Sequence, residues 1–177
     1  MIDVVWLNAM SEPEAFEAFL TCCGARRWAE QLTARRPYVD ETQLLNSARE
    51  VWHNLPAADW LEAFAAHPQI GEKPSPSAKA AAWSAGEQAG VANAADATRT
   101  ALADANRRYR EKFAWIFIVC ATGKSADEML TLIRQRLGND PAEELRIAAG
   151  EQEKITLLRL HKLTAERRAQ SPDRSSP

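Results

Sequence analysis

Signals that start a helix recur along this chain, and apolar residues at helical spacing follow them. Ser11-Glu12-Pro13-Glu14 and Ser125-Ala126-Asp127-Glu128 both place a serine three residues before a glutamate, which is the pattern of an N-terminal capping box. Apolar residues then recur three and four positions apart, the period of one helix face: Phe16, Phe19, Leu20 and Cys23 in the first segment, Met129, Leu132, Ile133 and Leu137 in the second. These helix-start signals and the apolar spacing that follows them indicate a chain built from amphipathic helices.

Four further segments show the same period. We expect helices over 40–55, 59–66 and 98–122, and a long one that begins at Asp140-Pro141 with an inner stripe of roughly Leu145, Ala148, Gln152, Ile155 and Arg159. No segment alternates apolar and polar residues over the length of a strand. The sequence therefore predicts an all-α fold, a single-domain compact bundle of about seven to nine helices over 1–165. It also predicts a frayed polar tail over 166–177.

Charge and composition exclude several classes of protein. The 22 basic and 24 acidic residues give a formal net charge of −2, which supplies no basic excess for binding nucleic acid. No run of about 18 apolar residues is present, so we expect no membrane partner, and the N-terminus carries no secretory signal pattern. The three cysteines have neither disulfide-framework nor zinc spacing, which indicates reduced, buried thiols in a cytoplasmic protein.

The motifs of several enzyme classes are missing. His53, His67 and His161 do not pair with other ligands at metal-binding spacing, so we expect no metal site. A phosphate-binding glycine loop, a dinucleotide fingerprint and a serine nucleophile elbow are also missing. What remains is chemistry by protonation and electrostatics, without a cofactor, or no chemistry.

His67 is the first candidate for such chemistry. It precedes Pro68, which disfavours helical backbone at position 67 and so predicts a helix end there. The residues that follow, 67–79, are rich in Pro, Gly and Ser, as loops that carry functional sites often are. An imidazole exchanges protons near neutral pH. Spacing alone nevertheless favours a structural interpretation, in which His67 complements the carbonyl end of the preceding helix.

Two further groups of polar residues leave alternatives open. Ser84, Glu87 and Gln88 share one face of a helix, where they would hold a urea-like ligand or simply face solvent; spacing favours solvent. Arg159 falls on the apolar stripe of the last helix, where it either snorkels to water or meets a buried carboxylate or an anionic ligand. The neighbouring charges of Glu151, Glu153 and Lys154 have the pattern of an ordinary solvated face.

Four motifs in order resemble the 2-oxo-4-hydroxy-4-carboxy-5-ureidoimidazoline (OHCU) decarboxylase family, over roughly residues 5–165. They are His67-Pro68-x-Ile70-Gly71, Ser84-x-x-Glu87-Gln88, Asn106-x-x-Tyr109-x-x-Lys112-Phe113 leading into Phe117-Ile118-Val119-Cys120-Ala121, and Glu151-x-x-Lys154-Ile155-x-x-x-Arg159-Leu160. The chain departs from the family pattern at one place. Family members usually carry Gly-Phe-Pro-Phe where this chain has Ala114-Trp115-Ile116-Phe117.

The resemblance implies an all-helical, homodimeric decarboxylase that forms (S)-allantoin in urate degradation and needs no metal or organic cofactor. It implies that His67 is the acid/base residue, Glu87 its partner and Arg159 a substrate-binding cation. It further implies a pocket lined by Pro68, Ser84, Gln88 and the backbone of Phe117, Ile118, Val119, Cys120 and Ala121.

Two other functions remain as alternatives. A lyase on the same scaffold would act on a related ureide or 2-hydroxy acid, although the Ser84 and Gln88 pair suits a urea-like group better than a plain hydroxy acid. A non-enzymatic module would use amphipathic helices and six tryptophans as a docking surface, which would leave the polar loop at His67 without a purpose.

Overall fold

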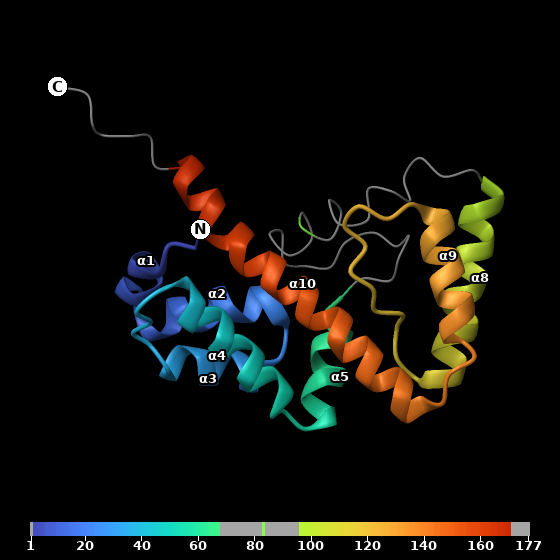
Figure 1. Cartoon of the computed structure of the whole chain (residues 1–177), viewed down its shortest axis with the longest axis horizontal. Helices are drawn as coiled ribbons and strands as arrows, with labels where there is room; N and C mark the ends of the chain where they lie inside the picture. Colours follow the sequence, from blue (N-terminus) through green and yellow to red (C-terminus); the bar gives the residue numbers. More distant parts are fainter. Residues whose placement is uncertain (1, 68–82, 84–95, 171–177) are drawn as a thin grey trace. The chain divides into compact units, whose positions relative to one another are not determined.

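The computed structural model describes residues 2–67, 83 and 96–170, with the backbone alone over 166–170 (Figure 1). These residues form eight helices and no strand, which confirms the all-α prediction. The helices are α1 (Val4–Ala9), α2 (Glu12–Cys23), α3 (Arg26–Ala34), α4 (Glu41–His53), α5 (Ala57–Ala65), α8 (Asp96–Phe113), α9 (Ala126–Arg136) and α10 (Pro141–Gln170). No helix in the described ranges carries an apolar stretch of the length needed to cross a membrane.

The chain divides into two compact units. Unit 1 comprises Met1–Asp59 and Ile155–Pro177, and unit 2 comprises Trp60–Lys154. The long helix α10 therefore contributes its first half to unit 2 and its second half to unit 1. Its backbone is helical to Gln170, within the segment 166–177 that we expect to be a frayed polar tail.

The predicted helix starts are confirmed where the structure gives their hydrogen bonds. The Glu14 carboxylate accepts from the backbone N–H of Ser11 at 2.9 Å, and Glu128 accepts from the N–H of Ser125 at 2.7 Å. Asp40 accepts from the N–H of Gln43 at 2.8 Å and so caps α4. Helices α1 and α3 have no counterpart among the predicted segments. The first has only six residues, and the second follows Ala25, whose side chain offers no cap.

Unit 1 has its own apolar core between α2, α3 and α4. The Trp28 ring meets the edge of Phe19 with ring centroids 6.1 Å apart, and its indole N–H donates to the carbonyl of Ala48 at 3.0 Å. One face of α4 lies in this core, with Leu44, Val51 and Trp52 at 2% exposure or less. The indole of Trp28 is therefore buried without an unsatisfied donor.

Unit 2 is built on α8 and α9, which lie side by side and run in the same direction in Figure 1. An extended segment, residues 117–121, adds alternate side chains to their shared core. This α8–α9 core contains Leu102, Ala105, Tyr109, Phe113, Phe117, Val119, Ala121, Ala126, Met129, Leu130 and Ile133. Ile118 and Cys120 are buried as well but do not belong to it, so side chains alternate along 117–121 as in a β-strand.

The predicted helix over 98–122 was wrong at its C-terminal end, because α8 stops at Phe113. Ala114 closes the last turn through its N–H to the carbonyl of Arg110 at 2.9 Å, and it takes the left-handed conformation with φ 66°. The residues after it are all apolar to Ala121, and 117–121 are all buried, so the sequence shows no period that would separate a strand from a helix. Left-handed backbone is where glycine is favoured, and the resemblance places a glycine at this position.

Replacing Ala114 with glycine should therefore stabilise the protein. A Cβ at positive φ costs about 1–2 kcal/mol. Because glycine also makes the unfolded chain more flexible, which lowers stability, we expect a net rise of about 1 kcal/mol in the free energy of unfolding. Ala103→Gly on the exposed side of α8 is the matched control and should lose about 1 kcal/mol. Urea unfolding of both variants measures the two signs. An Ala114→Gly variant as unstable as Ala103→Gly would contradict a strained turn.

Candidate active site

The predicted proton-transfer residue, His67, lies two residues beyond the end of α5. Its backbone N–H donates to the carbonyl of Phe64 at 3.1 Å, which closes the turn where the helix gives way, as the sequence predicted. The side chain is half-buried, and its Nε2 atom is shielded from solvent. The end of α5 therefore presents a half-buried imidazole with one shielded ring nitrogen. Pro68, Ser84, Glu87 and Gln88 fall outside the described residues.

The predicted cation, Arg159, is buried in the second half of α10. It is 4% exposed, on the same helix face as Gln152 at 0% and Ile155 at 5%. This burial rules out a side chain that snorkels to water, which was one of the two alternatives. Burying a guanidinium requires compensation of its charge by hydrogen bonds or an anion. Arg159 belongs to unit 1, and His67 belongs to unit 2.

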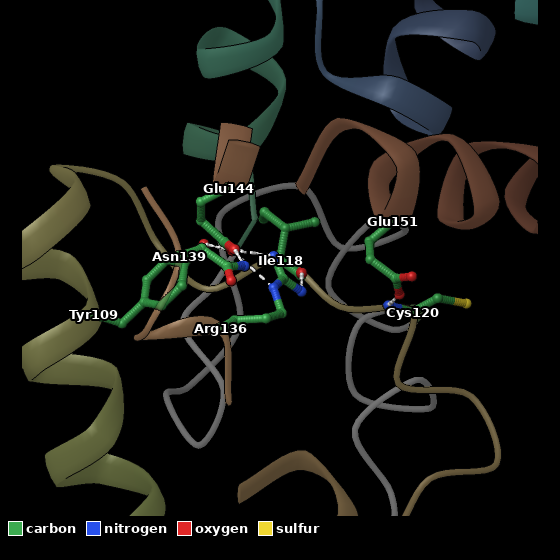
Figure 2. Close-up of polar contacts among 7 residues, drawn as sticks. All are labelled: Tyr109, Ile118, Cys120, Arg136, Asn139, Glu144 and Glu151. Atoms are coloured by element: carbon green, nitrogen blue, oxygen red, sulfur yellow. Dashed lines mark hydrogen bonds and ion pairs between the residues drawn. The ribbon is translucent and has the colours of Figure 1, made fainter. Parts of the chain in front are cut away.

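A buried ion pair fixes the extended segment 117–121 from one side. The Arg136 guanidinium contacts Oε1 of Glu144 through Nε at 2.7 Å and Nη2 at 2.5 Å, with side-chain exposures of 9% and 0% (Figure 2). The third guanidinium nitrogen, Nη1, donates to the carbonyl of Ile118 at 2.8 Å. Arg136 also lies over the ring of Phe117, 4.7 Å from its centroid. One arginine thus connects α9, the start of α10 and the extended segment.

The Glu144 carboxylate is satisfied by three side chains. Besides Arg136, it accepts from the hydroxyl of Tyr109 and, at 2.7 Å, from the amide of Asn139. Burial raises the pKa of the Tyr109 hydroxyl, and the hydrogen bond to Glu144 raises it further, so Tyr109 stays protonated and remains a donor. Because every oxygen of the carboxylate has donors, the cost of burying the charge is compensated.

Charged side chains hold Cys120 in the same segment. Oε2 of Glu151 accepts from the Cys120 N–H at 2.7 Å, and the Lys124 ammonium donates to the Cys120 carbonyl at 2.6 Å. Lys154 pairs with Oε1 of Glu151 at 2.5 Å. Burial raises the pKa of the Glu151 carboxyl, but the bonds from Lys154 and the Cys120 amide, with the charge of Lys124, outweigh burial and hold it below its usual value. Glu151 is therefore an ionised acceptor at neutral pH.

Sequence reasoning missed three of these residues. Glu151 was assigned to a solvated face, yet its side chain is 15% exposed and holds a backbone amide. Arg136 and Glu144 were not singled out. The buried stripe of α10 contains Glu144, Ala148 and Ile155, whereas we expected it to begin with Leu145, which is half-buried. An acidic residue at helical spacing from apolar ones was the signal that indicated a buried partner.

Known proteins resemble this chain over most of its length. The family model described as OHCU decarboxylase matches residues 8–161. The "Uric acid degradation bifunctional protein TTL" of Arabidopsis thaliana is 42% identical over 150 residues, 82% of this chain, which spans only 46% of that protein. The 2-oxo-4-hydroxy-4-carboxy-5-ureidoimidazoline decarboxylase of Amia calva is 31% identical, with 90% of this chain and 93% of that one covered. A crystal structure of OHCU decarboxylase in the presence of (S)-allantoin is 37% identical at a TM-score of 0.73, covering 88% of this chain and 99% of that chain.

Removing Glu144 should destabilise the protein strongly. Glu144→Ala leaves the Arg136 charge buried without its carboxylate, which costs about 3–5 kcal/mol. Glu143→Ala is the matched control, since Glu143 is exposed on the same turn of α10 and its loss should cost less than about 1 kcal/mol. Urea unfolding of both variants gives the two values. Equal losses would show that the ion pair does not hold unit 2 together.

Proposed function

The chain belongs to the OHCU decarboxylase family, and we propose that it converts 2-oxo-4-hydroxy-4-carboxy-5-ureidoimidazoline to (S)-allantoin and carbon dioxide in urate degradation. The observation that carries the proposal is the family match over residues 8–161, a range that contains all four motifs. The chain spans about half of the Arabidopsis relative, which is bifunctional by name, so the proposal concerns the decarboxylase reaction alone.

The substrate explains how so plain a site can catalyse decarboxylation. Its carboxylate is attached to a carbon that bears a hydroxyl and adjoins a ring C=N bond. When the bond to the carboxylate breaks, carbon dioxide leaves and the ring takes up the electron pair, so no pyridoxal or thiamine electron sink is required. The carbon that lost the carboxylate becomes the ring carbonyl as its hydroxyl gives up its proton. A proton must then reach the neighbouring carbon, which bears the ureido group and belonged to the C=N bond, from one face. The protein's contribution is to bind the ureido arm, exclude water and direct this proton, and we propose that it does so without a cofactor.

His67 is the proposed proton donor and Glu87 the residue that sets its orientation and charge. The support for His67 is its place at the fixed end of α5 and its shielded Nε2 atom. Arg159 is the proposed anchor for an anionic or carbonyl group of the substrate, supported by its burial in α10. Pro68, Ser84, Gln88 and the backbone of 117–121 are proposed to line the pocket.

We further propose that the protein is a cytoplasmic homodimer. All three cysteines, Cys22, Cys23 and Cys120, are free thiols in the structure, as in proteins of a reducing compartment. The dimer follows from the family resemblance, and light scattering of the purified protein measures it directly.

Freshly generated OHCU tests the activity and the role of His67 together. We expect the wild-type protein to form enantiomerically enriched allantoin, followed by circular dichroism, where uncatalysed decay gives a racemate. His67→Asn should fold normally and lose turnover by about a hundredfold, because the proton donor is gone. His53→Asn on the exposed side of α4 is the matched control. A racemic product from the wild-type protein would refute the activity, and full turnover by His67→Asn would refute the donor.

Arg159→Lys separates charge from geometry. Lysine keeps the charge but cannot reproduce two parallel hydrogen bonds to a planar carboxylate or ureido group. We expect KM to rise by about tenfold, with a smaller fall in kcat and little change in melting temperature, since one charge-assisted bond is lost. Arg146→Lys, exposed on the same helix, should behave as the wild type. Unchanged kinetics in Arg159→Lys would remove Arg159 from the substrate's contacts.

A further inference from the structure

We propose that Lys124 and Glu151 are positioning residues that orient and polarise the backbone of 117–121 for substrate binding. The inference rests on the proposed function, because it concerns the backbone groups that the substrate would meet. Neither side chain needs to touch the substrate. Each holds one polar atom of Cys120 and acts through the peptide bond on the neighbouring residue.

The contacts of the segment lie on three consecutive peptide groups. Arg136 holds the oxygen of the peptide 118–119, Glu151 holds the N–H of the peptide 119–120, and Lys124 holds the oxygen of the peptide 120–121 (Figure 2 shows the first two). Each of these contacts involves a charged group at 2.6–2.8 Å, the range of charge-assisted hydrogen bonds. Three neighbouring peptide planes are thus fixed in rotation about the chain axis.

The opposite ends of these peptides follow from covalent geometry. The cis bond found in the described residues is Arg36-Pro37, so these three peptides are trans, and C=O and N–H point in opposite directions. The N–H of Val119 therefore points away from Arg136, the carbonyl of Val119 away from Glu151, and the N–H of Ala121 away from Lys124. Within the described part of the chain these three groups make no hydrogen bond.

The held charges also change the strength of the groups at the far ends. A cation at a peptide oxygen draws electron density from the amide and makes its N–H a stronger donor, and an anion at an N–H makes the carbonyl a stronger acceptor. Val119 and Ala121 thus present two strengthened donors, and Val119 one strengthened acceptor. A planar group with a carbonyl or carboxylate oxygen beside an N–H, such as a ureide, matches this set.

A purely structural role would appear only in stability. Arg136 already ties the segment to the buried ion pair, whereas Lys124 is half-buried on the loop after it, so its contact is not required to bury the core. The two roles therefore predict different results for substrate binding when Lys124 or Glu151 is replaced.

Steady-state kinetics on freshly generated OHCU separate these roles. Lys124→Met and Glu151→Ala should each raise KM by about tenfold with kcat within about threefold, because a directed donor or acceptor is misaligned in bound substrate and transition state alike. Glu151→Gln should raise KM less than Glu151→Ala, since its amide oxygen still accepts from the Cys120 N–H but no longer carries the charge that strengthens the Val119 carbonyl. Glu111→Ala, exposed on α8, is the matched control. Wild-type KM in Lys124→Met and Glu151→Ala, with only the melting temperature lowered, would overturn the proposal.

Amide proton shifts supply a readout that does not depend on activity. In the unliganded protein, Lys124→Met should move the Ala121 amide proton upfield, as expected for a less polarised N–H, and leave exposed α8 amides unchanged. If the wild-type protein fails to turn over OHCU, the proposed function fails while this shift still tests the polarisation. An Ala121 amide that is unaffected by Lys124→Met would refute it.

Discussion

The buried ion pair of Arg136 and Glu144 is the interaction on which the described part of unit 2 depends. It joins α9 to the first turn of α10. Glu144 also accepts a hydrogen bond from the hydroxyl of Tyr109 in α8, and Arg136 donates one to the carbonyl of Ile118 in the extended segment. Burying this pair costs solvation free energy, which its hydrogen bonds must offset. The pair therefore contributes mainly by fixing the arrangement of the elements around it, because few other arrangements would satisfy all of its donors and acceptors.

The extended segment follows from that constraint. Its odd-numbered side chains enter the α8–α9 core, so its backbone lies at the surface of the core with polar groups that need partners. Arg136, Glu151 and Lys124 satisfy one set of them. The turn that releases the segment from α8 forces Ala114 into left-handed backbone. Local backbone strain is thus located where α8 ends and the extended segment begins.

Features were predictable from the sequence when the interacting residues lie close together along the chain. The caps at Ser11, Asp40 and Ser125 were predictable because each involves residues three apart in sequence. The end of α8 was missed because the residues after Phe113 are all apolar, and a run buried on every side has no period. Glu151 was misassigned because the backbone amide that it binds belongs to Cys120, thirty-one residues away.

The sequence by itself determined the helical class, most of the helix starts and, through the motifs from His67 to Arg159, the family. These depend on local spacing and on the order of chemical groups, which a linear chain carries in full. Only the tertiary structure decided that Arg159 is buried, that Glu144 has its ion-pair partner in Arg136, and that the backbone of 117–121 is held by charged side chains. Burial and hydrogen-bond partners are properties of what packs around a residue, and the chain supplies those neighbours from distant positions only when it folds.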